Sequence, residues 1–153
     1  MKIKSKKVSK RQEALGFAVE KTVKMMRLTF NRLLLLHPEA DVTVDQWILI
    51  NILNKYGNLS QQELGELTFK DAPTVTRMID LMVQKGMVTR LSDIKDRRKF
   101  VISLTESGEK LFKLTETVAR EFRASAYDDI SDEELEILDG ILKKIFDNLS
   151  KQN

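Results

Sequence analysis

The chain has no cysteine and only one histidine among its 153 residues. The absence of cysteine excludes disulfides, thiolate zinc sites and cysteine-based redox sensing. The single histidine, His37, precedes a proline at the expected end of a helix, where a structural role is the simpler interpretation. Because transition-metal sites depend on these two residue types, we expect no metal and no cofactor.

Signals of several other protein classes are also missing. No apolar run reaches the roughly 18 residues needed to cross a membrane, so we expect no membrane span. The basic N-terminus lacks the apolar segment of a secretory signal, and we therefore expect a cytoplasmic location. There is no glycine-rich phosphate loop and no nucleophile with a nearby base, so we do not expect an enzyme.

The charge of the chain is unevenly distributed, although the net charge is only +3. Residues 1–11 contain six cations and no acid, and residues 90–99 contain five cations and two acids. Positive charge gathered in this way can steer a polyanion to one face of a protein. For the N-terminal tail alone, a purely solubilising role remains an equal alternative.

Hydrophobic periodicity and turn residues predict the order of the elements. We expect helices over residues 12–36, 43–56, 60–68, 72–85, 105–127 and 131–149, and strands over residues 87–92 and 99–104. Three helix starts carry a hydroxyl followed three residues later by Glu or Gln, which is the capping-box pattern. These pairs are Thr43 with Gln46, Ser60 with Glu63, and Ser131 with Glu134.

This order predicts a mainly α fold with a small β-hairpin wing. Residues 43–104 form a winged helix-turn-helix, and the helices over residues 12–36 and 105–150 lie outside this module. Their apolar stripes could pack within one chain or against a second chain. We favour a homodimer, because palindromic DNA sites are bound by twofold dimers.

The helix over residues 72–85 has one apolar face and one polar face. Its apolar face contains Val75, Met78, Ile79 and Met82, which we expect in the core. Short hydroxyl side chains, amides and arginine near a helix N-terminus suit the reading of bases in a major groove. The candidates for DNA binding on this helix are Pro73, Thr74, Thr76, Arg77 and Gln84.

The expected turn between the two strands is basic and contains neither Gly, Asn nor Pro, the residues that simple turns favour. Cations at such a tip can enter a narrow, negatively polarised minor groove. The candidates in this wing are Lys95, Arg97, Arg98 and Lys99. Asp96 would repel DNA, so we expect it to brace the wing instead.

The stretch from residue 63 to residue 108 reads ELGELTFKDAPTVTRMIDLMVQKGMVTRLSDIKDRRKFVISLTESG and resembles the MarR family of bacterial transcriptional regulators. The order of the expected elements is similar to that family over the whole chain. The matching features are Thr76-Arg77, Lys85-Gly86, the Asp96 and Arg98 of the wing, and the Leu104-Thr105 to Gly108 junction. One wing position that is often Arg in the family is Lys95 here, which excludes a bidentate contact at that position.

The resemblance implies a homodimer that binds an inverted repeat of double-stranded DNA and represses nearby genes. It also implies an ion pair between Asp71, at the start of the recognition helix, and Arg98 in the wing. Some members release DNA when a small organic, often phenolic or anionic, compound binds.

Two interpretations stay open for the tryptophan and the methionines of this chain. They are either core residues, or Met25, Met26, Phe30 and Trp47 line an effector cavity, because methionine adapts to varied ligands. The alternative to a DNA-binding regulator is a winged-helix protein-interaction module that does not bind DNA.

Overall fold

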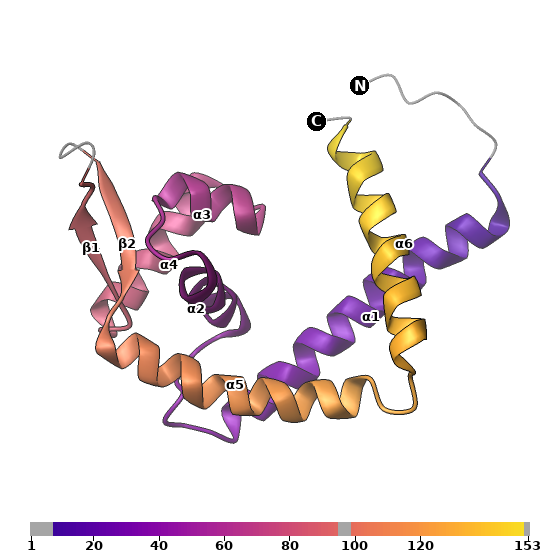
Figure 1. Cartoon of the computed structure of the whole chain (residues 1–153), viewed down its shortest axis with the longest axis horizontal. Helices are drawn as coiled ribbons and strands as arrows, with labels where there is room; N and C mark the ends of the chain where they lie inside the picture. The colour runs from indigo at the N-terminus through magenta and orange to yellow at the C-terminus, as the bar shows by residue number, and fades with distance from the viewer. Residues whose placement is uncertain (1–7, 95–98, 152–153) are drawn as a thin grey trace. The chain divides into compact units, whose positions relative to one another are not determined.

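The computed structural model of this chain describes residues 8–94 and 99–151. Over these residues it contains six helices and one antiparallel hairpin (Figure 1), and the predicted fold class is confirmed. The elements are α1 (Lys10–Leu35), α2 (Val44–Tyr56), α3 (Gln61–Thr68), α4 (Ala72–Gln84), β1 (Val88–Ser92), β2 (Phe100–Leu104), α5 (Glu106–Ala126) and α6 (Asp132–Ser150). Each boundary lies within two residues of its predicted position.

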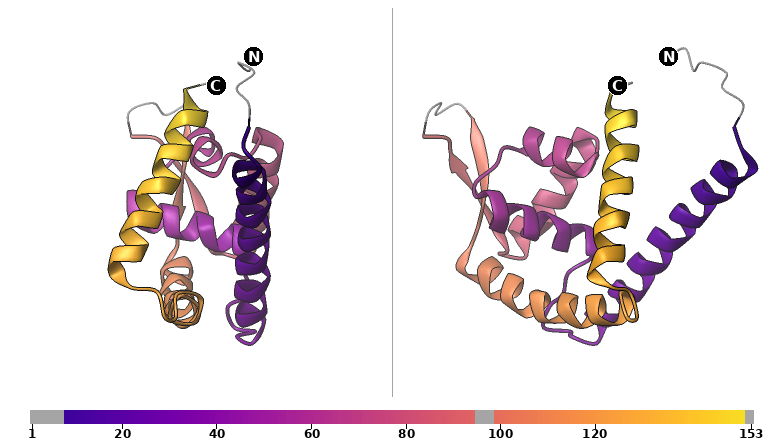
Figure 2. Two further views of the ribbon diagram at one scale, coloured as in Figure 1. Left: turned by 90° about the vertical axis from the view of Figure 1, so that its right-hand side faces the viewer. Right: turned by 45° about the vertical axis from the view of Figure 1, so that its right-hand side comes forward.

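The chain divides into two compact units. One unit is Met25–Phe122, and the other combines Met1–Lys24 with Arg123–Asn153. The first unit holds α2, α3 and α4 beside the hairpin, as Figure 2 also shows. In the hairpin, Val88 lies opposite Leu104, and Leu59, which precedes α3, forms a further bridge with Ile102.

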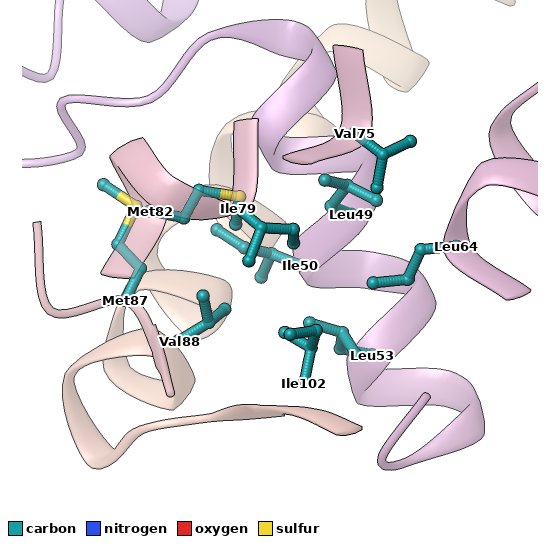
Figure 3. Close-up of a cluster of buried hydrophobic side chains, with 10 residues drawn as sticks. All are labelled: Leu49, Ile50, Leu53, Leu64, Val75, Ile79, Met82, Met87, Val88 and Ile102. Carbon is teal, nitrogen blue, oxygen red and sulfur yellow. The ribbon is translucent and has the colours of Figure 1, made fainter. Parts of the chain in front are cut away.

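The core of the larger unit joins every element of the winged helix-turn-helix. Ten buried side chains form one cluster (Figure 3), so the hairpin and the three helices share a single apolar interior. They are Leu49, Ile50, Leu53, Leu64, Val75, Ile79, Met82, Met87, Val88 and Ile102. Fully burying an aliphatic side chain of this size stabilises a fold by about 1.5–3 kcal/mol, so this cluster sets the geometry of the module.

A second cluster lies where α1, α2 and α5 meet within the same unit. Its buried members are Phe30, Leu34, Val44, Val118 and Ala119. The Phe30 ring packs edge-on against the ring of Trp47, with centroids 4.5 Å apart, and lies 5.3 Å from the ring of Phe122.

The predicted helix starts are confirmed in detail. All three capping boxes form, with both reciprocal hydrogen bonds present in each. Asp71 caps α4, Pro73 is accommodated in its first turn, and Gly86 adopts a φ of 70° after its end. These local rules hold because each cap satisfies backbone amides that the helix itself leaves without partners.

The expectation that the methionines are core residues is wrong for Met25. Met82 and Met87 are buried and Met78 is half-buried, but the Met25 side chain is 56% exposed. Met25 precedes the buried Phe30 by five residues, which places it about 140° round the helix from that side chain. It therefore faces away from the core that Phe30 enters.

The smaller unit leaves its apolar side chains exposed. The structure describes every residue of α6, and none of them is buried. Seven apolar side chains of this helix are at least 39% exposed, and the N-terminal half of α1 carries more exposed apolar side chains. Those of α6 are Ile137, Leu138, Ile141, Leu142, Ile145, Phe146 and Leu149, and those of α1 are Leu15, Phe17, Val19 and Val23.

The junction between the hairpin and α5 is a close backbone contact. The Thr105 hydroxyl accepts from the Gly108 amide at 3.0 Å and donates to the carbonyl groups of Gly86 and Met87. A Cβ atom at Gly108 would lie 2.1 Å from the Met87 carbonyl oxygen, well inside van der Waals contact. Glycine is therefore required here by space.

We expect Gly108→Ala to lower the free energy of unfolding by about 1–3 kcal/mol, because the added methyl group forces the Met87 backbone to move. Urea unfolding followed by circular dichroism measures this change. The control is Gly140→Ala in α6, where the new Cβ meets no atom within 4 Å and should stabilise the helix by about 0.5–1 kcal/mol. Equal effects of the two substitutions would contradict the proposed role of the junction.

Candidate nucleic-acid interface

The orientation of α4 is set by its buried face. Val75, Ile79 and Met82 are buried, and the prediction that this stripe enters the core is confirmed. The opposite face is exposed to solvent because a helix turns about 100° per residue. It presents Pro73, Thr76, Arg77, Asp80 and Gln84, while Thr74 on its flank is half-buried.

The N-terminus of α4 is held by a carboxylate. Asp71 accepts from the Thr74 amide at 2.8 Å through Oδ1 and from the Thr74 hydroxyl at 2.9 Å through Oδ2. The hydrogen bond from the backbone amide, followed by that from the hydroxyl, lowers the pKa of Asp71. A lowered pKa means that the cap stabilises the fold at neutral pH and loses this effect only as the carboxylate becomes protonated in acid.

A side-chain hydrogen bond connects α3 to the exposed face of α4. The Gln61 amide nitrogen donates to the Thr76 hydroxyl oxygen at 3.0 Å. Both residues line an open hollow of about 450 Å³ between the two helices. Gln61 was not predicted as a site residue, because its position at the start of α3 does not reveal which helix it faces.

An ion pair connects α4 to the hairpin. Arg90 of β1 donates to the Asp80 carboxylate, which lies on the exposed side of α4. This pair was not predicted, although the sequence carries a signal for it. Arg90 follows the buried Val88 by two residues, so its side chain leaves the strand on the side that faces the helix.

A third polar contact anchors the segment that precedes α4. The Asp45 carboxylate of α2 lies 2.8 Å from Arg27 of α1 and 3.3 Å from Lys70, which precedes the cap of α4. Partial burial raises the pKa of Asp45, but hydrogen bonds from Arg27 and Lys70 outweigh it, and the net shift is downward. The pair of cations therefore keeps this carboxylate ionised at neutral pH.

Part of the predicted wing lies within the described residues. Lys99 is exposed, and its carbonyl oxygen accepts from the Asp93 amide at 2.9 Å, which closes the base of the turn. The other predicted wing residues, Lys95, Asp96, Arg97 and Arg98, lie outside the described residues, and so does the expected ion pair between Asp71 and Arg98.

The four residues predicted to line an effector cavity do not all come together. Phe30 and Trp47 are in contact, and Met26 is half-buried one helical turn before Phe30. Met25 is exposed and is not part of this cluster. The indole nitrogen of Trp47 is buried and meets no hydrogen-bond acceptor among the described residues.

In residues 8–94 and 99–151, no three acidic or histidine side chains are grouped in a way that suits a metal ion. Over the same residues, no helix combines the length and the apolar character needed to cross a membrane.

Comparison with known proteins identifies the relatives of this fold. The MarR family model matches residues 40–99. A MarR transcriptional regulator from Methanosarcina mazei is 24% identical, with 92% of this chain and 99% of that chain covered and a TM-score of 0.79. A mutant of MarR from E. coli complexed with operator DNA is 23% identical, with coverages of 86% and 93% and a TM-score of 0.77.

A third solved structure adds a small molecule to the comparison. BpsR from Bordetella bronchiseptica, whose DNA binding is regulated by 6-hydroxynicotinic acid, is 21% identical. Here 86% of this chain and 92% of that chain are covered, with a TM-score of 0.76. The family model matches residues 40–99, and the fold agrees with the solved MarR structures over most of the chain, so this chain is similar to the MarR family of transcriptional regulators and has its fold.

Proposed function

We propose that this chain is a repressor that binds an inverted repeat of double-stranded DNA as a homodimer. The observation that carries the proposal is the exposed N-terminal face of α4, held against a hairpin whose turn is basic. A helix offering Thr76, Arg77 and Gln84 suits the major groove, and a neighbouring basic ribbon suits the minor groove. The operator complex of the E. coli relative supports the same assignment.

The DNA-binding region in this proposal is residues 43–104. Its contacts are Pro73, Thr74, Thr76, Arg77 and Gln84 on α4, with Lys95, Arg97, Arg98 and Lys99 in the wing. Phosphate contacts fix the position of the protein on the duplex, whereas contacts with base edges select the sequence. The proposal assigns Lys99 to the first role and Arg77 to the second.

We expect Arg77→Ala and Lys99→Ala to fail in different ways. Loss of Arg77 should cost about 1–3 kcal/mol on the preferred duplex and change the sequence preference. Loss of Lys99 should weaken binding to all duplexes about equally and reduce the slope of log affinity against log salt by roughly one unit. Fluorescence anisotropy at several salt concentrations, on a duplex selected from a random pool, measures both.

Lys113→Ala is the matched control, because this exposed lysine lies on α5 and outside the proposed interface. It should leave both the affinity and the salt slope unchanged. If the wild-type chain binds no duplex at all, the protein is a winged-helix interaction module instead. If Arg77→Ala keeps the same site preference, Arg77 contacts the backbone rather than a base.

The helices over residues 12–36 and 105–150 are the dimerisation helices of this proposal. Exposed apolar side chains recur along α6 and along the start of α1, whereas monomers commonly expose such residues singly. A second copy of the chain would cover them, and an inverted repeat requires a twofold dimer.

We expect the wild-type chain to sediment at about twice 17.7 kDa at micromolar concentration. Leu142→Glu should shift it towards the monomer, because a carboxylate would be buried without a partner in the interface. Lys144→Glu is the control, since that side chain lies about 200° round α6 from Leu142 and adds at least as much negative charge. A wild-type monomer that binds the inverted repeat tightly would refute the dimer.

The proposed effector is a small organic molecule that binds near Met26, Phe30 and Trp47. The Trp47 indole N–H meets no acceptor among the described residues, and an apolar site with such a donor suits an aromatic compound that carries an acceptor group. The regulation of BpsR by 6-hydroxynicotinic acid supports this class of compound.

Trp47 is the single tryptophan of the chain, so its fluorescence reports on this site alone. We expect an aromatic carboxylate that releases DNA also to change this emission. Trp47→Phe keeps a ring and removes the N–H, and should raise the concentration needed for release about tenfold. Leu28→Ala, at an exposed position of α1, should not. Reversible release by zinc or peroxide would instead contradict a purely organic effector.

A further inference from the structure

Two threonine hydroxyls of α4 have protein partners of opposite kinds. The Thr74 hydroxyl donates to the Asp71 carboxylate at 2.9 Å. The Thr76 hydroxyl accepts from the Gln61 amide nitrogen at 3.0 Å. Both threonines lie in the first half of α4, the part of a recognition helix whose side chains reach base edges.

The partner of each hydroxyl determines whether that hydroxyl can still donate or only accept a further hydrogen bond. A hydroxyl carries one proton and two acceptor lone pairs. The hydrogen bonds to Asp71 keep that side chain ionised, and an ionised carboxylate can only accept. The Thr74 hydroxyl therefore uses its proton in the hydrogen bond to Asp71 and can only accept a further hydrogen bond.

Thr76 is in the reverse position. The amide nitrogen of Gln61 has only protons to give, so Thr76 uses a lone pair in this contact and keeps its own proton. Because Thr76 is exposed, that proton can be directed towards a ligand in front of α4. Two hydroxyls that are alike in sequence are thus fixed as one acceptor and one donor.

This difference matches the pattern of groups in the major groove. The amino groups of adenine and cytosine are donors, whereas the N7 atoms of purines, O6 of guanine and O4 of thymine are acceptors. Phosphate oxygens accept only, so a hydroxyl that has already given its proton gains nothing from the DNA backbone.

We propose that Thr74 selects a base that presents an amino group and that Thr76 selects a base that presents an acceptor, with Asp71 and Gln61 as the positioning residues that set this polarity. The inference rests on the proposed DNA-binding function and adds to it the chemical class of base at two positions of each half-site.

The test uses the full chain and a duplex selected from a random pool by the wild type. Anisotropy then measures binding to duplexes in which each position of the half-site carries each of the four base pairs. Thr74→Val and Thr76→Val keep the shape of the side chain and remove its hydroxyl. Each should reduce the preference at one position by about 3- to 10-fold, the range for a single net hydrogen bond.

The decisive variants keep both threonine hydroxyls and exchange their roles as hydrogen-bond donor and acceptor. In Asp71→Asn, the amide oxygen still caps α4, and its nitrogen donates to Thr74, which frees the proton of that hydroxyl. In Gln61→Glu, the carboxylate accepts the proton of Thr76 and leaves only lone pairs. We expect the preferred base to change from amino-bearing to acceptor-bearing in the first variant, and in the opposite sense in the second.

Gln62→Glu is the matched control for the added negative charge. Gln62 is the next residue of α3, and its amide donates to Glu66 at 3.0 Å rather than to α4. This variant should leave the base preference unchanged. Urea unfolding of every variant shows that the altered preference belongs to a folded protein.

Three results would overturn the inference. If Asp71→Asn keeps the wild-type base preference, Asp71 does not determine the hydrogen-bonding role of the Thr74 hydroxyl. Thr76→Val that weakens all duplexes equally would assign Thr76 to the phosphate backbone, and Gln62→Glu that matches Gln61→Glu would reduce the effect to charge. By contrast, a wild-type chain without any preferred duplex would overturn the proposed function itself.

Discussion

The rotation of α4 about its own axis is the constraint on which the proposed interface depends. Val75, Ile79 and Met82 enter the core shared with α2, α3 and the hairpin, and no other rotation buries all three. Once that face is fixed, Arg77 and Gln84 must face solvent. The apolar residues of the recognition helix therefore determine the direction of the polar residues, although none of them would touch DNA.

Polar contacts then fix the surroundings of this helix. Asp71 caps its start, Gln61 reaches it from α3, and Asp80 ties its side to Arg90 of β1. Exposed pairs of this kind contribute little to stability, about 0–1 kcal/mol. Their consequence lies in pre-organisation, because side chains already held in place lose less freedom when a ligand binds.

The fold was predictable from the sequence where its signals are local, and the site only in part. Capping boxes and apolar periodicity act within a few residues, so they placed every described element and the buried face of α4. The contacts of Gln61 and Arg90 depend on which elements become neighbours, and no local rule states that. Phe69 shows the same limit, since it ends α3 in a left-handed conformation, with a φ of 54°, at a position where glycine is usual.

Amphipathic helices show a second limit of prediction from sequence. α4 and α6 both carry a clear apolar stripe, yet α4 buries three residues within the chain and α6 buries none. Apolar periodicity predicts that one face of a helix is covered, but it does not indicate whether the same chain or a second chain covers that face. In α4 the cover is the core of the chain itself. In α6 the apolar face stays exposed within one chain, and in the proposed dimer a second copy that presents the same face would cover it.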